Sequence, residues 1–315
     1  MRLVYLLPIV IIATLATHRA CNRNQSASPQ DGLLPAPLTA GPDDRLTIYT
    51  TFYPTTYLTS QIVQGVADVV CPVPAGADPI FWQPDDASIA AYQAADLIVI
   101  NGAGFEKWVA TTTLPTGNIV DTSKPLGGDF LKYKDAITHS HGEGAEHSHE
   151  GTDGHTWVDP QNAITQAGEI LAALTEQFPD QSATLQTNFD ALSEKLGSLH
   201  QSLNTVPAGT PLLANHPAYN YLARRHGWEI ENLDLDPAAA PSEAQLLEIQ
   251  VVLQDHPAKI ILWKSSPLPA TAALLKDQFG LTSLTFSPCE SPPPEGDYLS
   301  SMQQSISTLT GALTK

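Results

Sequence analysis

The chain has 315 residues and a formal net charge of −18, with 33 acidic residues against 15 basic ones. A surface this acidic repels polyanions, which excludes DNA and RNA as partners, and it concentrates cations. Hydrophobic residues make up 42% of the chain and charged residues only 15%, which indicates a folded protein rather than a disordered one. The length predicts two domains.

The first residues have the pattern of an export signal. Arg2 is followed by an apolar run that is too short to cross a bilayer, where about 20 residues are needed, so residues 1–20 are predicted to be a signal peptide. Cys21 follows a small residue at the end of this run, which is similar to a bacterial lipobox. We expect either a lipid on Cys21 or simple cleavage before it. Residues 21–44 are rich in Ser, Pro, Gln and Asn, which predicts a flexible tether.

Short apolar runs then alternate with helical patterns. The expected strands and helices, in chain order, are strand 46–51, helix 57–66, strand 69–73, helix 85–94 and strand 96–101. A further helix is expected over 160–178, because Asp159 is a good N-cap and Pro160 suits the first helical position. Alternation of this kind favours a parallel sheet with helices on its faces.

A long helix is predicted over residues 179–204, where leucines recur at helical spacing. Beyond it the alternation restarts, with strands over 211–215, 229–234, 259–264 and 281–286 and helices over 218–226, 242–254, 270–279 and 298–313. Ser242 with Gln245 forms a capping-box pattern at the head of one of these helices.

The predicted fold class is therefore α/β, with two similar α/β lobes joined by a long rigid backbone helix. The lobes are expected over residues 45–178, including a His-rich loop at 135–153, and over residues 205–315. Each lobe is expected to hold a mostly parallel sheet flanked by helices, with the helix of residues 179–204 between them. Ligands of such folds gather beyond the carboxyl ends of the strands, which predicts a ligand cleft between the lobes.

Five phrases of the sequence, in this order, carry a family resemblance. They are VPAGADP from Val73, ADLIVING from Ala95, GHTWVDPQN from Gly154, NHPAYNYLARRHG from Asn215 and GDYLSSM from Gly296. Together they resemble the zinc/manganese solute-binding proteins of bacterial ABC importers, the cluster A-I group, over nearly all of residues 46–313. The resemblance implies a non-enzymatic, exported protein at the cell surface or in the periplasm. Such a protein captures Zn²⁺, or Mn²⁺ as the alternative, and delivers it to the membrane permease of an ABC importer.

The resemblance also implies metal ligands. His155 and His216 match two of the family's four ligand positions, and imidazole nitrogen suits Zn²⁺ better than Mn²⁺. The other two positions fall at Ile80, which cannot bind a metal, and at Ser287, whose hydroxyl is a poor replacement for a carboxylate. Either Cys71, Asp78, Cys289, Glu290 or a histidine of the loop replaces the missing ligands, or the site binds metal weakly. Since imidazole must be neutral to bind, affinity is expected to fall as the pH drops through about 6.5.

The two cysteines of the mature body leave two alternatives open. Cys71 and Cys289 could form one disulfide in an oxidising compartment, or they could remain free thiols.

The histidines of the His-rich loop are a separate candidate site. They are His139, His141, His147 and His149, and glutamates lie among them. Such a tract cannot pack as a core, but it can chelate metal weakly in many geometries. The alternative is a solvated polar insertion without a metal role.

Two rival functions compete with metal capture. Two histidines, an acidic residue and an open metal position would also suit a zinc hydrolase, although the chain has no His-Glu-x-x-His helix. The second rival is a degenerate family member that acts as an adhesin or as a receptor for an organic ligand. Ile80, Phe81 and Trp82 favour it if they line the mouth of the cleft.

Overall fold

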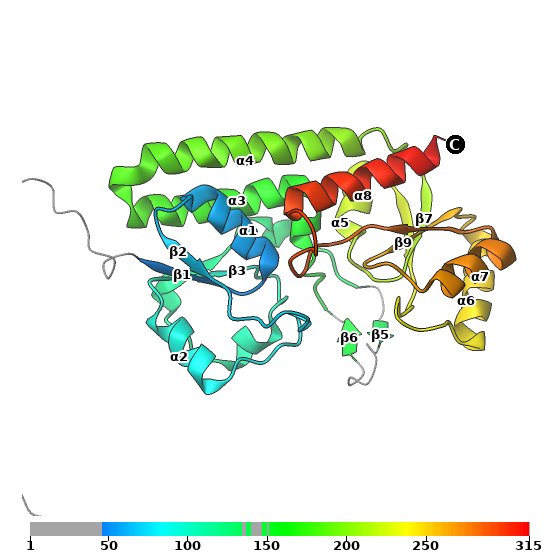
Figure 1. The fold of residues 1–315 in the computed structure, drawn as a ribbon, viewed down its shortest axis with the longest axis horizontal. Coiled ribbons are helices and arrows are strands. Elements are labelled where there is room, and N and C mark those ends of the chain that lie inside the picture. The colour runs from blue at the N-terminus through cyan, green and yellow to red at the C-terminus, as the bar shows by residue number, and fades with distance from the viewer. Residues whose placement is uncertain (1–45, 134–136, 140–146, 150, 315) are drawn as a thin grey trace, which may run out of the picture. The chain divides into compact units, whose positions relative to one another are not determined.

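The computed structural model of the protein describes residues 46–133, 137–139, 147–149 and 151–314 (Figure 1). The predicted signal peptide, the lipidation site Cys21 and the tether lie outside the described residues, as does His141.

The first lobe is built on a four-stranded parallel sheet in the order β2-β1-β3-β4. Its elements are β1 (Thr47–Thr50), α1 (Tyr53–Val63), β2 (Asp68–Val70), α2 (Asp86–Ala94), β3 (Leu97–Ile100) and β4 (Ile119–Asp121). Every residue of β3 is buried, as expected for a central strand of a parallel sheet covered on both faces.

The second lobe repeats this arrangement with β7 (Pro211–Ala214), α5 (Asn220–His226), β8 (Glu229–Asn232), α6 (Glu243–Asp255), β9 (Ile260–Trp263), α7 (Pro269–Phe279), β10 (Thr282–Thr285) and α8 (Tyr298–Leu313). Its sheet is also parallel and has the order β10-β9-β7-β8. Counted from the first strand of each lobe, both sheets follow the order second, first, third, fourth. The predicted fold of two similar α/β lobes is confirmed.

Two long helices connect the sheets: α3 (Pro160–Gln177) and α4 (Ser182–Leu203). Figure 1 shows α4 running alongside α3, and α4 also contacts α1 and α8. The leucines of α4 that face these helices are buried, and they belong to a core cluster that also contains residues of β1 and β7. One continuous apolar core therefore supports both sheets. The sequence-based limits of the lobes and the linker stay a prediction.

The caps predicted from the sequence are present. Asp159 accepts a hydrogen bond from the backbone N–H of Gln161 at the start of α3, and Ser242 and Gln245 form the capping box of α6. The start of α1 differs from the prediction. It begins at Tyr53, ahead of the predicted residue 57, because Pro54 fits its first turn and the side chain of Thr55 bonds the backbone of Phe52.

Two features were not predicted. Strand β4 is only three residues long, too short for its hydrophobic pattern to stand out. Two parts of the His-rich loop form a two-stranded antiparallel sheet, β5 (Ile137–His139) and β6 (His147–His149), in which His139 pairs with His147. Within the described parts of the chain, none of the helices is long and apolar enough to cross a membrane.

The core under α4 gives a stability prediction. Leu196 is fully buried, whereas Leu247 on α6 is 60% exposed. Leu196→Ala should lower the free energy of unfolding by about 2–5 kcal/mol, because it leaves a cavity in the shared core. The same change at Leu247 should alter it by less than about 0.5 kcal/mol. Denaturant titration measures both; equal effects of the two substitutions would contradict the packing described for α4.

Candidate metal centre

The candidate site lies at the carboxyl ends of the central strands. In each sheet the strand order reverses between two neighbours, β1 and β3 in the first lobe and β7 and β9 in the second. Loops that leave a parallel sheet at such a point diverge to opposite sides, and ligands bind in the crevice between them. His216 lies in the loop after β7, and Lys264 directly follows β9.

Asn215 fixes the loop that carries His216. Its Oδ1 accepts a hydrogen bond from the backbone N–H of Lys264 at 2.8 Å, and its Nδ2 donates to the carbonyl of Leu235 at 2.9 Å. Asn215 is buried, so both bonds are shielded from water. The positions of His216 and Lys264 at the end of the sheet are therefore coupled through one side chain.

Asn101 has the corresponding role in the first lobe, where it directly follows β3. Its Nδ2 donates to the carbonyl of Gly154 at 2.9 Å, and its Oδ1 accepts from Thr156 Oγ1 at 3.2 Å. These bonds hold the residues on both sides of His155. A Cβ at Gly154 would lie 3.0 Å from the Cβ of Phe105, so this position suits glycine.

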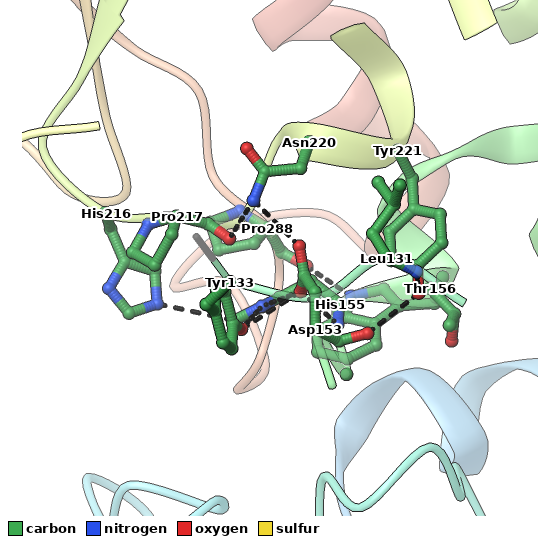
Figure 2. A network of polar contacts seen from close by, with 12 residues as sticks. Leu131, Tyr133, Asp153, His155, Thr156, His216, Pro217, Asn220, Tyr221 and Pro288 are labelled. Carbon is green, nitrogen blue, oxygen red and sulfur yellow. Dashed lines mark hydrogen bonds and ion pairs between the residues drawn. The ribbon is translucent and has the colours of Figure 1, made fainter. Parts of the chain in front are cut away.

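Asp153 orients the ring of His155. One oxygen of its fully buried carboxylate bonds His155 Nδ1 at 2.9 Å and accepts from the backbone N–H of the same residue at 3.0 Å. Tyr133 donates to this oxygen at 3.0 Å, and Asn220 Nδ2 donates to the other at 2.9 Å. Figure 2 shows this network together with the contact between His155 and His216. A carboxylate on one ring nitrogen orients the ring so that the other nitrogen points toward the metal position.

Three donor atoms meet at the centre of the site. His155 Nε2 lies 3.3 Å from His216 Nε2 and 3.2 Å from Glu290 Oε1, and His216 Nε2 lies 3.5 Å from the same oxygen. A tetrahedral Zn²⁺ with donors at about 2.0–2.1 Å has donor-to-donor edges of about 3.3–3.4 Å. The spacing of these atoms therefore matches one face of a zinc tetrahedron. Among the described residues, no other group of three His, Cys, Asp or Glu side chains converges in this way.

The charges around the donors are unevenly distributed. Burial opposes protonation of His155, but the hydrogen bonds and charges of Asp153 and Glu290 outweigh it and raise the pKa of this imidazole to about 9. Burial and the positive charge of Lys264 lower the pKa of His216 well below 6.5. Burial would raise the pKa of Glu290, but Lys264 and the two imidazoles hold it well below its usual range. Near neutral pH, His216 and Glu290 are ready to bind a cation, whereas His155 must first lose a proton.

The loop that carries Glu290 is attached to the first lobe. It follows β10, and its Pro288 carbonyl accepts a hydrogen bond of 2.7 Å from Trp157 Nε1, two residues after His155. Tyr298 OH donates to the carbonyl of Trp157 at 2.8 Å. Indole and phenol bonds of this kind set the distance between the loops that carry His155 and Glu290.

Of the candidate residues from the sequence, the structure brings together His155, His216 and Glu290. Cys71 and Cys289, the two cysteines in the described part of the chain, are free thiols, and neither belongs to the cluster. Asp78 also lies outside it and accepts a turn bond of 3.0 Å from the backbone N–H of Ile80. For His139, His147 and His149 the structure describes the backbone in β5 and β6 but not the side chains.

Ile80 and Ser287 stand at the two positions that depart from the family's ligand pattern, and both have contacts that stabilise the fold. Ile80 is 4% exposed and belongs to the main core cluster. Ser287 Oγ accepts from the backbone N–H of Cys289 at 3.1 Å, and the Ser287 N–H donates to Ser305. The carboxylate comes from Glu290, three positions further along the chain.

Sequence reasoning missed Asp153 and Lys264. An acidic residue two positions before a predicted histidine ligand is a usable signal for Asp153, because metal-bound histidines commonly bond a carboxylate. Lys264 ends a predicted buried strand, where ligands of α/β folds gather. Its contact with the site depends on a loop distant in the sequence, and no local pattern reveals that contact.

Comparison with known proteins identifies the family of this chain and several relatives. The model of the ZnuA family, described as zinc-uptake complex component A, periplasmic, matches residues 48–312. The zinc-binding lipoprotein AdcA of Streptococcus pneumoniae is 30% identical over 281 residues, which are 85% of this chain and 56% of AdcA. The high-affinity zinc uptake system protein ZnuA of Bacillus subtilis is 29% identical over 292 residues, 86% of this chain and 88% of that protein.

The crystal structure of the Zn(II)-bound ZnuA-like domain of Streptococcus pneumoniae AdcA superimposes with a TM-score of 0.70 at 25% identity. The match covers 86% of this chain and 100% of that domain, whereas the chain spans only about half the length of the whole AdcA protein. Because the family model covers nearly all of the described residues, the chain belongs to the ZnuA family of zinc-uptake solute-binding proteins.

Proposed function

We propose that this protein is the extracytoplasmic solute-binding component of an ABC importer, which captures Zn²⁺ and delivers it to a membrane permease. His155, His216 and Glu290 are the proposed ligands. The observation that carries the proposal is the spacing of their three donor atoms, 3.2–3.5 Å, which fits one face of a zinc tetrahedron.

The donor set favours zinc over other divalent ions. Two imidazole nitrogens with one carboxylate oxygen suit Zn²⁺, whereas Mn²⁺ prefers a larger share of oxygen ligands. The names of the relatives point the same way, since AdcA is called a zinc-binding lipoprotein and the Bacillus subtilis ZnuA a zinc uptake protein. Mn²⁺ is the second candidate cargo.

Export and membrane attachment belong to the same proposal. The family is described as periplasmic, and AdcA is called a lipoprotein. A signal peptide over residues 1–20 and a lipid on Cys21 would place the protein outside the cytoplasm and beside its permease.

A binding protein is favoured over a zinc hydrolase. A hydrolase needs a carboxylate or histidine that is free to take a proton from a metal-bound water. At this site Glu290 is needed as a ligand, and Asp153 is saturated by His155, Tyr133 and Asn220. The surroundings of the donors therefore support holding an ion rather than activating a water.

The receptor for an organic ligand is not favoured either. That hypothesis required Ile80, Phe81 and Trp82 to line the mouth of a cleft. Ile80 is instead buried in the main core cluster, Phe81 packs against it, and Trp82 packs against Trp108 in a second cluster. These side chains stabilise the first lobe.

Ligand substitutions test the site. His155→Ala, His216→Ala and Glu290→Gln should each weaken Zn²⁺ binding by more than about 100-fold, because each removes a direct donor, and loss of an outer-sphere partner alone costs 10- to 100-fold. Competition with a chromophoric chelator measures the affinity of the untagged protein. Cys71→Ser and Cys289→Ser are matched controls that should stay within about twofold of wild type under reducing conditions. Wild-type affinity in both histidine variants would remove the proposed site.

The pH dependence of binding tests the electrostatics. The raised pKa of His155 means that Zn²⁺ must displace one proton from its imidazole at any pH below about 9. Between pH 6 and 8 the association constant should rise about tenfold per pH unit, instead of levelling off above the 6.5 expected from the sequence. Calorimetry in buffers of different ionisation enthalpy should detect about one proton released per ion. An affinity that is flat between pH 7 and 8 would contradict the role of Asp153.

A further inference from the structure

Lys264 is a cation beside the proposed cation site. It directly follows β9, its side chain is only 15% exposed, and its Nζ lies 4.0 Å from Glu290 Oε2. The other carboxylate oxygen, Oε1, faces His155 and His216. The carboxylate of Glu290 therefore lies between the ammonium group of Lys264 and the place where the metal would bind.

The separation of 4.0 Å is too long for a hydrogen bond, so the contact between Lys264 and Glu290 is electrostatic. The backbone of Lys264 is nevertheless held near the site. The backbone N–H of Lys264 bonds Asn215 Oδ1 at 2.8 Å, and Asn215 precedes His216. The side chain that fixes the loop of a proposed ligand thus also fixes the backbone of the lysine.

The distance between Lys264 Nζ and a bound ion has an upper limit. The path runs from Nζ to Oε2, across the carboxylate to Oε1, and then along a metal–oxygen bond of about 2.0–2.2 Å, which limits the separation to about 8 Å. Even with the dielectric constant of bulk water, repulsion between a single and a double positive charge at about 8 Å weakens binding roughly fivefold. A lower dielectric constant inside the protein makes the effect larger.

We infer that Lys264 is a release-promoting residue, which limits how tightly the His155, His216 and Glu290 site holds a divalent cation. This inference rests on the proposed function. Two effects of the lysine act in the same direction. Its charge repels the ion, and its attraction for Oε2 opposes rotation of the carboxylate into a geometry in which both oxygens would bind the metal.

Lys264 also has an opposite effect on the site. The lysine also helps to keep Glu290 ionised and His216 neutral, which favours binding. Lys264 is the largest influence that stabilises the Glu290 carboxylate, and the two imidazoles act in the same direction; burial is the largest cause of the low pKa of His216. The test is made at pH 8, well above the ordinary pKa values of Glu and His, so that both groups stay in their metal-binding forms without the lysine. The repulsion acts on a doubly charged ion, so removal of the lysine should strengthen binding.

The test is the Zn²⁺ dissociation constant and dissociation rate of the full chain with Lys264→Met, measured at pH 8 by chelator competition and stopped-flow chelation. We expect the dissociation constant to fall at least about fivefold and zinc to leave more slowly. Lys264→Gln should behave in the same way, and Lys264→Arg, which keeps the charge, should stay within about twofold of wild type. Thermal melts of each variant verify folding.

Lys259→Met is the matched control. Lys259 is exposed and precedes β9, so it lies at the opposite end of the strand that Lys264 follows. Both substitutions change the net charge equally, and Lys259→Met should leave zinc affinity unchanged. Equal strengthening of zinc binding by Lys264→Met and Lys259→Met would overturn the inference, and so would unchanged or weaker binding in Lys264→Met and Lys264→Gln.

The ligand variants separate a failure of this inference from a failure of the proposed function. If His155→Ala and His216→Ala bind zinc like wild type, the proposed function itself fails. If they lose binding while Lys264→Met has no effect, only the role of Lys264 fails.

Discussion

The metal centre depends on three donor atoms that are held at the edge length of a zinc tetrahedron by three loops distant in the sequence. His155, His216 and Glu290 each come from a different loop, and their donor atoms lie 3.2–3.5 Å apart. Bringing two imidazoles and a carboxylate this close in a buried site costs free energy, which the surrounding structure must offset. The asparagines after β3 and β7, the carboxylate of Asp153 and the bond from Trp157 to the loop of Glu290 provide that support.

Asn101 and Asn215, which support the ligand loops, both lie at the point where the strand order of their sheet reverses. Both sheets have the same strand order, so each has a switch point between its first and third strands. An asparagine lies next to this point in both lobes: Asn101 after β3 and Asn215 after β7. Asn101 bonds the backbone of Gly154, next to the proposed ligand His155. Asn215, next to the proposed ligand His216, bonds the backbone of Lys264. The shared core under α4 supports both sheets, so the geometry of the site rests on the whole fold.

Most of the fold was predictable from the sequence, and about half of the site. The order of strands and helices followed from hydrophobic periodicity and caps such as Asp159 and Ser242, whereas β4 was too short to give a period. His155 and His216 were singled out by the phrases around them. Glu290 could only be one candidate among several, because its approach to the histidines depends on the path of the loop after β10. Lys264 and Asp153 act through contacts between distant segments, which single-sequence reasoning does not reveal.

The most direct test of the central claim is the zinc K-edge X-ray absorption spectrum of the protein loaded with one equivalent of Zn²⁺. The account predicts two imidazole nitrogens and carboxylate oxygen at about 2.0–2.1 Å, with no sulfur in the coordination shell. The multiple-scattering signal of the imidazoles should be half that of the wild type in His155→Ala, and likewise half in His216→Ala. A zinc–sulfur distance near 2.3 Å, or an imidazole signal unchanged in both variants, would show that the ion is bound elsewhere and would contradict the account.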